Sequence, residues 1–495
     1  MKTLLFFYIS LTLTPLLHAQ QTQKAEKKER KPNIILIYAD DLGEGLLGCY
    51  GQKIIKTPHI DSLAKEGMKF TNAYGGVYCA PARATLLTGL HEGRKGVWNI
   101  SKGGGIIGID SGKLTYEEVQ KNLSKHIPAK EGEIFLAQLA QKAGYVTGQF
   151  GKLDWGFQTT HKRLTRHGWD HYVGYYDHQR AHGFYPPYLW KDGKKLRLKG
   201  NTHHNAAKTL EKTYNDEATK KRRNMEGKEI YSQNVFLAEM LKFIDANQKK
   251  PFFLYHSTQL PHGPVSIPEV HPELEDRKDL SDIEKEYGSM VKMLDDHVGI
   301  LLKKVKDLGL ENDTIFIFTS DNGHETYYLN GGKAVTRKRD YHGESDVFKG
   351  TAGLAGTKWT PWQGGSHVPL IVRWPNKIQA GSSSARLVSN YDHLVTFADI
   401  MGLETPKGKD GLTYLPALFG KQGKEHEFIY LFNRMVITND GWKLVKDKKE
   451  FLLFNLITDP GERKNLADSK PEKLKELKLI FSQQLRSERR DLGTN

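Results

Sequence analysis

The chain has 495 residues, of which 38% are hydrophobic and 10% aromatic, and its formal net charge is +15. Length and composition exclude a disordered chain, and only two cysteines exclude a framework of disulfides. They fit a large α/β domain with a smaller appendage, and the positive charge favours polyanionic partners through long-range attraction.

The first 19 residues have the layout of a secretory signal peptide: Lys2, an apolar run from Leu4 to Leu17, and then Ala19. The run is shorter than the roughly 20 apolar residues that cross a bilayer, so we expect cleavage and no stable membrane insertion. Residues 20–31 are rich in Lys, Glu and Gln and predict a polar leader. The protein is therefore expected to be periplasmic or secreted. No nucleic-acid module is recognisable, so a sulfated polysaccharide fits the charge better than nucleic acid.

In residues 32–419 short apolar runs alternate with helical patterns, which predicts an α/β domain. We expect a large mixed, mainly parallel sheet that is flanked by helices. Strands are predicted at 34–38, 146–150, 252–256 and 314–319. Helices are predicted from Pro58 to Gly67, over 133–143, and from Met290 to Val305, where apolar residues recur at helical spacing.

Near Pro416 the pattern changes to shorter segments, with strands predicted at 428–432 and 442–445. A charged helix is predicted from about Lys470. Residues 420–495 are therefore expected to form a small C-terminal α+β domain with an antiparallel sheet and a helix.

Polar residues follow four of the predicted strands: Asp40-Asp41, Lys152, His262, and Asp321-Asn322. Ligands of open α/β sheets gather at the carboxyl ends of the strands, so we expect these side chains to converge. Three carboxylates and one amide oxygen suit a hard cation such as Ca²⁺ or Mg²⁺. Taken singly, each acidic pair could instead be a turn or a helix cap.

Cys79 begins the motif Cys-Ala-Pro-Ala-Arg at 79–83, in which Pro81 can open a helix and place the cysteine at its positive end. By itself this pattern could also mark a structural thiol or a redox cysteine of low pKa. A disulfide between Cys79 and Cys49 is a further alternative.

With these residues in view, the sequence resembles a type I sulfatase of the alkaline phosphatase-like superfamily, whose signature is Cys-x-Pro-x-Arg followed by Thr-Gly. The resemblance spans most of the chain. It includes Asp-Asp-Leu-Gly at 40–43, Leu-Gly-Cys-Tyr-Gly at 47–51, Thr-Pro-His-Ile-Asp at 57–61, Gly-Lys at 151–152, Pro-His-Gly-Pro at 261–264, Ser-Asp-Asn-Gly at 320–323, Lys358 six residues before Gly364-Gly365, and Asp-Pro-Gly-Glu at 459–462 with Asn465-Leu466.

The resemblance implies that a maturation enzyme oxidises Cys79 to formylglycine, whose hydrate attacks sulfur and then expels sulfate as it returns to the aldehyde. It implies a Ca²⁺ or Mg²⁺ ion bound by Asp40, Asp41, Cys79, Asp321 and Asn322. Arg83, Lys152 and Lys358 would stabilise the sulfuryl oxygens. Asp321 would activate the attacking hydroxyl, and His262 with Lys358 would protonate the departing alcohol.

Three residues, at two places in the chain, depart from the family pattern. Many members carry a histidine two residues after the catalytic lysine, where this chain has Asp154. We therefore expect Asp154 or His182 to take over as the base that releases sulfate. Ser366-His367 replaces an aliphatic residue and an arginine, which is expected to affect structure or substrate fit.

Substrate contacts are predicted at Arg180 and His182, within an aromatic block from Trp169 to Trp190 that could form a sugar-stacking wall or pack in the core. His324, Lys338, Arg339 and His342, after the second acidic pair, are further candidates.

The sequence thus favours an exported hydrolase of carbohydrate sulfate esters, with galactose- or hexosamine-type glycans as the broad substrate class. A phosphodiesterase or phosphonate monoester hydrolase of the same superfamily is the alternative enzyme. A catalytically silent polyanion-binding protein is the alternative of a different class.

Overall fold

The computed structural model describes residues 30–91, 103–125, 133–154, 156–202, 216–329 and 335–486. The predicted signal peptide and most of the polar leader lie outside these residues. Within the described part of the chain, no helix has both the length and the apolar character needed to span a bilayer. The chain from Lys31 onward forms one compact unit.

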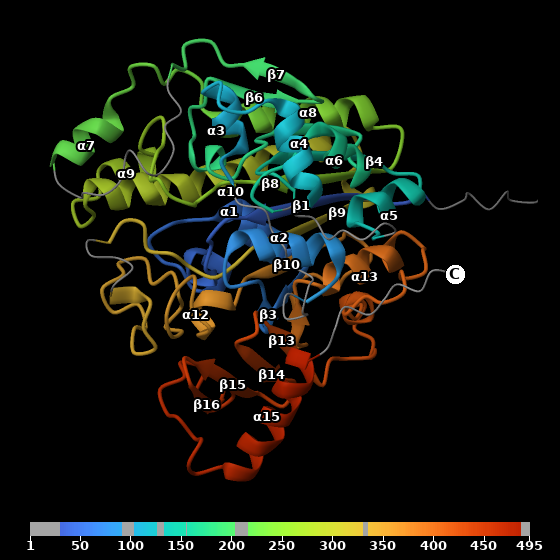
Figure 1. Ribbon diagram of the computed structural model, residues 1–495, viewed down its shortest axis with the longest axis vertical. Coiled ribbons are helices and arrows are strands. Elements are labelled where there is room, and N and C mark those ends of the chain that lie inside the picture. Colours follow the sequence, from blue (N-terminus) through green and yellow to red (C-terminus); the bar gives the residue numbers. More distant parts are fainter. Residues whose placement is uncertain are drawn as a thin grey trace, which may run out of the picture. The chain divides into compact units, whose positions relative to one another are not determined.

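A ten-stranded sheet forms the centre of this unit (Figure 1), in the order β11-β2-β10-β9-β1-β8-β4-β5-β6-β7. Its strands are β1 (Asn33–Ala39), β2 (Met68–Phe70), β4 (Val146–Gly151), β5 (His171–Gly174), β6 (Tyr188–Lys191), β7 (Lys194–Arg197), β8 (Phe252–Ser257), β9 (Thr314–Ser320), β10 (Leu370–Arg373) and β11 (Ser382–Ser384). Two short strands, β3 (Ala73–Tyr74) and β12 (Val388–Ser389), pair separately.

The middle of the sheet is parallel, because β9, β1, β8, β4 and β5 all run in one direction. Strands β10, β6 and β7 are antiparallel to their neighbours. The predicted mixed, mainly parallel sheet is confirmed, as are all four strands predicted for it.

Helices cover both faces of the sheet, and β1 shows why. Its residues are buried throughout, and they alternate between two hydrophobic cores. Ile35 and Ile37 pack with α1, α8 and α10, whereas Ile34 and Leu36 pack with α2, α5 and α13. A strand buried on both faces reads as a continuous apolar run, which is the pattern that the sequence displays.

The helices are α1 (Pro58–Lys65), α2 (Cys79–Thr88), α3 (Gly105–Asp110), α4 (Tyr116–Lys125), α5 (Leu136–Lys142), α6 (His161–Arg166), α7 (Asp216–Arg223), α8 (Ser232–Asn247), α9 (Pro272–Glu275), α10 (Asp282–Asp307), α12 (Gln363–Ser366), α13 (Asp392–Ile400), α14 (Leu415–Leu418) and α15 (Pro471–Arg486). The helix predicted over 133–143 is shorter. Gln138 accepts a hydrogen bond from the backbone N–H of Phe135 (2.8 Å), which caps α5 at that point.

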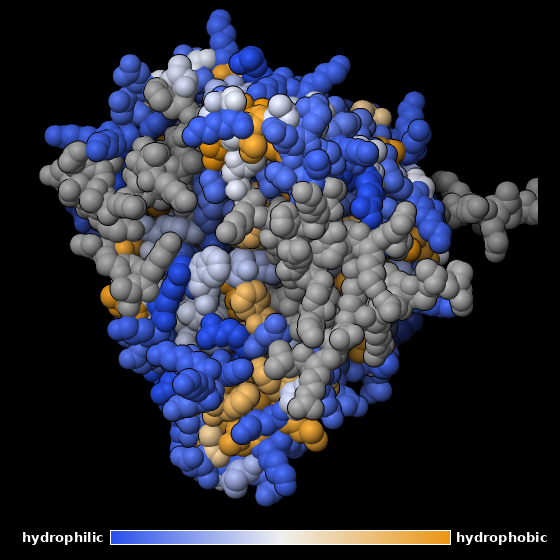
Figure 2. Space-filling model, viewed as in Figure 1, coloured by the Kyte–Doolittle hydropathy of each residue, from blue (hydrophilic) through white to orange (hydrophobic). Residues whose placement is uncertain are grey.

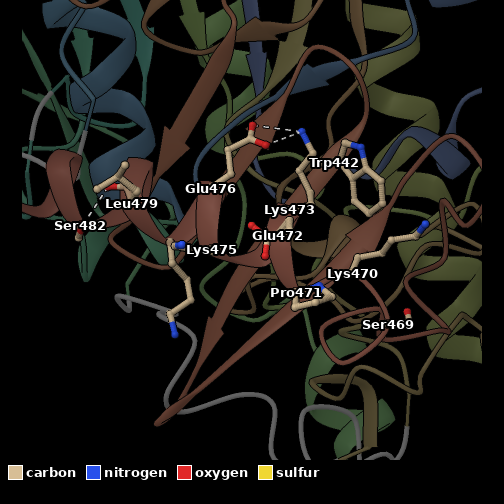
Figure 3. A pocket seen from close by; sticks show the side chains of 11 residues that line it. Trp442, Ser469, Lys470, Pro471, Glu472, Lys473, Lys475, Glu476, Leu479 and Ser482 are labelled. Atoms are coloured by element: carbon tan, nitrogen blue, oxygen red, sulfur yellow. Dashed lines mark hydrogen bonds and ion pairs between the residues drawn. The ribbon is translucent and has the colours of Figure 1, made fainter.

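The C-terminal part of the chain forms an antiparallel sheet of β13 (Phe428–Leu431), β14 (Met435–Thr438), β15 (Trp442–Asp447) and β16 (Glu450–Asn455), with α15 packed on it. This confirms the expected antiparallel sheet with a helix. A groove of about 1110 Å³ lies along α15, and Lys473 in it is paired with Glu476 at 2.9 Å. Figure 3 shows the side chains that line this groove.

A buried ion pair within the C-terminal part of the chain is also hydrogen-bonded to the large domain. Lys443 on β15 and Glu462 lie 2.8 Å apart and are both fully buried. Glu462 also accepts a hydrogen bond from the backbone N–H of Gln363 (2.6 Å), at the start of α12. The Asp-Pro-Gly-Glu segment recognised in the sequence therefore holds the loop that follows Lys358.

Candidate active site

The carboxyl edge of the parallel strands gathers the predicted site. Asp40-Asp41 follow β1, Asp321-Asn322 follow β9, Lys152 follows β4, and His262 lies in the loop after β8. These residues come from four separate strand ends and are all buried. The convergence expected from the sequence is thus present in the structure.

The acidic residues are in direct mutual contact. The backbone N–H of Asp41 donates to Asp321 Oδ1 (3.1 Å), and Asn322 Nδ2 donates to Asp41 Oδ1 (2.8 Å). Asp41 adopts a positive φ of 63°, a left-handed conformation that costs free energy in a residue with a side chain. The fold therefore tolerates backbone strain and the repulsion of like charges to bring these oxygens together.

Neighbouring charges set the pKa values of the three carboxyls. Burial alone would raise the pKa of Asp40, but Lys152 and Arg83 outweigh burial and lower it to about 2. The pKa of Asp41 is lowered against burial mainly by Lys358. Burial and the nearby Asp40 raise the pKa of Asp321 well above its ordinary range. The carboxyl of Asp321 is thus held close to that of Asp40 despite strong repulsion, and a bound cation would relieve this repulsion.

A divalent cation fits the donors that are present. Candidate ligand atoms of Asp40, Cys79 and Asp321 lie within 4.8 Å of one another, as do those of Asp40, Asp41 and His262. The amide oxygen of Asn322 is buried and accepts no hydrogen bond from the described part of the chain. Carboxylate and amide oxygens are what Ca²⁺ and Mg²⁺ prefer, so the chemistry of the donor set matches such an ion.

Cys79 is the first residue of α2 and is only 3% exposed. Its Sγ lies 4.0 Å from Lys358 Nζ and 3.6 Å from His178 Nε2. Burial raises the pKa of the thiol despite the nearby lysines, which is the opposite of what a low-pKa redox cysteine needs. Cys49 and Cys79 are both free, so the disulfide alternative does not hold.

Three buried cations surround Cys79 and the carboxylates. Arg83 Nη2 lies 2.9 Å from Asp321 Oδ2, Lys358 Nζ lies 2.8 Å from Asp41 Oδ1, and Lys152 forms an ion pair with Asp40. Despite burial, the carboxylates raise the pKa of Arg83 and of Lys358, which keeps both positively charged. Such a site can bind an anionic group and stabilise negative charge that develops on it.

Three histidines form a stacked group beside these charges. The ring of His182 is parallel to that of His262, with centroids 4.6 Å apart, and meets His178 edge to face at 4.6 Å. His262 Nε2 lies 3.4 Å from Asp41 Oδ2. Burial lowers the pKa of all three well below the usual value, so the imidazoles are neutral at neutral pH.

Two residues of the site were not predicted from the sequence. His178 follows β5, a strand of four residues that was not predicted because it lies inside an aromatic block. Recognising β5 would have placed His178 after another parallel strand, as for Asp40, Lys152 and Asp321. Tyr327, whose hydroxyl donates to Asp41 Oδ2 and whose ring lies 5.0 Å from that of His262, gives no comparable signal in the sequence.

The predicted replacements for the missing family histidine lie in different surroundings. Asp154 is fully buried and bonded to His167 Nδ1 at 2.5 Å, so its carboxylate already has a partner. His182 is within the histidine group but makes its ring contacts with His178 and His262. The imidazole that reaches Cys79 is His178.

The predicted substrate contacts also find structural partners. Arg180 is bound to Asp110 (3.1 Å), and His324 is fully buried with Nε2 3.0 Å from the hydroxyl of Tyr328. His367 pairs with Glu44 (3.1 Å), and His342 Nε2 lies 2.7 Å from the carbonyl of Gly461. Most rings of the aromatic block are buried, which supports core packing over a sugar-stacking wall: Trp169, Tyr172, Tyr175, Tyr176, Phe184, Tyr185 and Tyr188.

Comparison with known families matches residues 32–403 to the family described as Sulfatase. Residues 358–491 match the family described as N-sulphoglucosamine sulphohydrolase, C-terminal. An N-acetylgalactosamine-6-O-sulfatase of Bacteroides thetaiotaomicron is 27% identical over 92% of this chain and 94% of its own length. The N-acetylgalactosamine-6-sulfatase of Canis lupus familiaris is 30% identical over 81% of this chain and 68% of its own.

Solved structures show the same fold. One, described under the metabolism of multiple glycosaminoglycans by Bacteroides thetaiotaomicron, superposes with a TM-score of 0.69 at 24% identity and covers 92% of this chain and 100% of that one. Ps i-CgsB in complex with k-i-k-neocarrahexaose gives 0.68 at 24% identity, covering 93% and 96%. A phosphonate monoester hydrolase of Agrobacterium radiobacter gives 0.59 at 21% identity, covering 92% and 96%.

Proposed function

This chain belongs to the sulfatase family and is a sulfuric ester hydrolase, and from that premise we propose that it removes sulfate from sulfated carbohydrates. The contact of Cys79 with Lys358, beside Arg83 and the three carboxylates, carries the proposal, because it is built to bind and polarise an anionic group. The names of the relatives support galactose- or hexosamine-type sugars as the first to test.

The test is sulfate release from defined sulfated sugars, measured on protein coexpressed with a maturation enzyme. We expect release from at least one sulfated galactose or hexosamine and none of phosphate from the matching phosphate esters. Preferential release of phosphate would contradict the proposal in favour of the phosphodiesterase or phosphonate hydrolase alternative. Binding without release of either anion would indicate the catalytically silent protein.

We propose that Asp40, Asp41, Asp321 and Asn322 hold Ca²⁺ or Mg²⁺ next to position 79. When bound, the ion supplies a positive charge that polarises the sulfuryl group. Conversion of Cys79 to formylglycine would supply an oxygen nucleophile where the buried thiol, with its raised pKa, is a poor one.

The remaining roles follow from position and charge. Arg83, Lys152 and Lys358 would bind the sulfuryl oxygens and stabilise their charge. Asp321, whose pKa is raised mainly by burial, would take the proton of the attacking hydroxyl. Lys358, which stays protonated, would deliver a proton to the departing alcohol, and His262, which is neutral in this site, would contact the sulfate.

We assign to His178 the role of the base that releases sulfate from position 79, because its Nε2 is 3.6 Å from Sγ of Cys79. His178→Ala is expected to lower kcat about 10²- to 10⁴-fold, the usual contribution of general acid–base catalysis. Added imidazole should restore part of the lost rate, which a merely structural histidine would not allow. Steady-state kinetics with and without imidazole measure both effects.

Asp154→Ala and His182→Ala are the matched comparisons for His178→Ala. Asp154→Ala removes the partner of His167 and should lower stability more than turnover of the folded enzyme. If either variant loses turnover while His178→Ala keeps it, the base is the residue expected from the sequence and the assignment of His178 is wrong.

We also propose that the protein is exported and that its folded part has two domains. The Lys2–Ala19 pattern supports a cleaved signal peptide, 1–19, before a polar leader, 20–31, and a periplasmic or secreted location. We place the catalytic domain at 32–419 and the small C-terminal domain at 420–495, a division supported by the end of α14 at Leu418 and the start of β13 at Phe428.

A further inference from the structure

A cleft of about 630 Å³ lies where three distant parts of the chain meet, a volume within the range of roughly 300–1,000 Å³ that is usual for ligand sites. It is lined by a segment after Asn322, by the residues that follow Lys358, and by the C-terminal sheet. Its lining is Arg337, Lys338, Arg339, Trp359, Thr360, Pro361, Trp362, Arg434, Asp447, Lys448, Glu450, Leu452 and Asn465. We call it the cationic cleft.

The cationic cleft has a marked excess of positive charge. Five of its lining residues are Lys or Arg, against two that are acidic. One of the two acids, Asp447, already lies 3.5 Å from Arg434. Arg337 is held by Glu325 (2.6 Å), whose side chain is only 1% exposed. The positive groups are thus partly fixed in place, and the excess charge favours an anionic ligand.

Trp359 gives the cleft an exposed aromatic ring. Its side chain is 43% exposed, and the Arg337 guanidinium lies 5.8 Å from the ring centroid. The backbone has a φ of +72°, a conformation that a side-chain-bearing residue rarely adopts without a compensating reason. Of the coloured surface in Figure 2, most is hydrophilic, and an exposed aromatic ring can contact the apolar face of a sugar.

Short contacts link the cationic cleft to Cys79. The ring of Trp359 stacks on that of Tyr78 at 4.0 Å, and its backbone N–H donates to the carbonyl of Val77 (2.8 Å). Tyr78 immediately precedes Cys79, and Lys358, which reaches Cys79 Sγ at 4.0 Å, immediately precedes Trp359. The cleft therefore adjoins the residues that hold the reacting sulfate ester.

We propose that the cationic cleft binds a negatively charged sugar unit next to the one that loses its sulfate. The proposal rests on the proposed function and deepens it: the substrate is an oligosaccharide with a second anionic group, either a sulfate ester or the carboxylate of a uronic acid. The exposed part of the Trp359 ring offers an apolar contact, and Lys338 and Arg339 attract the charge.

Three disaccharides with the same sulfated unit test this, with a neutral sugar, a uronic acid or a second sulfated sugar as its neighbour. The product is identified by mass so that release from the shared unit alone is measured. The wild-type enzyme should have a higher kcat/KM on the charged disaccharides, and the arm with the higher value identifies the anion. In Lys338→Gln/Arg339→Gln that advantage should fall about 5- to 10-fold, with the neutral disaccharide within twofold of wild type.

The control is Lys470→Gln/Lys475→Gln, which removes the same charge from the groove along α15 in Figure 3. Added salt should reduce the preference of the wild type and of this control, but not that of the cleft variant. If all three proteins prefer the charged disaccharides equally, the proposal for the cationic cleft is wrong, while the proposed function remains intact. No hydrolysis of any disaccharide by the wild type would instead count against the proposed function itself.

Discussion

Replacing Cys79 by alanine is expected to reduce hydrolysis of sulfate esters at least about 10⁴-fold, as loss of a covalent nucleophile does elsewhere. The cations and carboxylates around position 79 would remain, so substrate affinity should change far less than kcat. Initial rates on the best substrate of the panel measure this, and the melting temperature of the variant checks its fold. Alanine is small and suits α2, so the structure should tolerate the change.

Mass spectrometry of the wild type shows whether residue 79 is an unmodified thiol or formylglycine. Oxidation of the thiol to formylglycine lowers the mass of that peptide by about 18 Da. We expect the converted fraction to match the active fraction across preparations with and without a maturation enzyme. Full activity in protein whose Cys79 is an unmodified thiol would contradict the formylglycine proposal, and Cys49 in the same digest serves as the unmodified reference.

Removal of the divalent cation is expected to lower activity about 10³-fold, because an ion at this position contributes several kcal/mol to charge stabilisation. It should also lower the melting temperature by a few degrees, since Asp40, Asp41 and Asp321 would repel one another without it. Dialysis against a chelator, followed by return of Ca²⁺ or Mg²⁺ singly, measures both effects and identifies the ion.

Asp40→Asn should require more metal for half-maximal recovery of the melting temperature. Asp296→Asn provides the matched control, because Asp296 belongs to a separate cluster with His59 and Asp295. If chelation leaves both the melting temperature and the rate unchanged, the carboxylates are balanced by Arg83, Lys152 and Lys358 alone and the metal proposal is wrong.

The sequence predicted Asp40, Asp41, Lys152, His262, Asp321 and Asn322 because they follow apolar, buried strands, whereas Cys79, Arg83 and Lys358 were predicted from their motifs. Such strands can be predicted from their apolar composition. The carboxyl ends of parallel strands lie at the same edge of the sheet, whatever the order of the strands is. The order itself, with β1 between β9 and β8, depends on long-range pairing that leaves no local pattern. The same reasoning failed at β5, which has four residues, and therefore missed His178.

Predicted substrate contacts were less informative, because residue type says little about which way a side chain points. His324 and Arg180 look like exposed loop residues in the sequence, yet Tyr328 and Asp110 bind them. The ring of exposed Trp359, by contrast, is unremarkable in the sequence next to Lys358. Its exposure depends on a positive φ and on the stacking with Tyr78, which only the fold supplies.

The buried pair of Lys443 and Glu462 limits how the chain can be recombined with its relatives. Severing such a pair leaves an uncompensated charge in the interior, at a cost of about 3–5 kcal/mol. Because Lys443 lies on β15 and Glu462 lies beyond β16, a chimaera that exchanges the strands alone would separate the pair. An exchange of the small sheet should therefore include residues 459–462 as well.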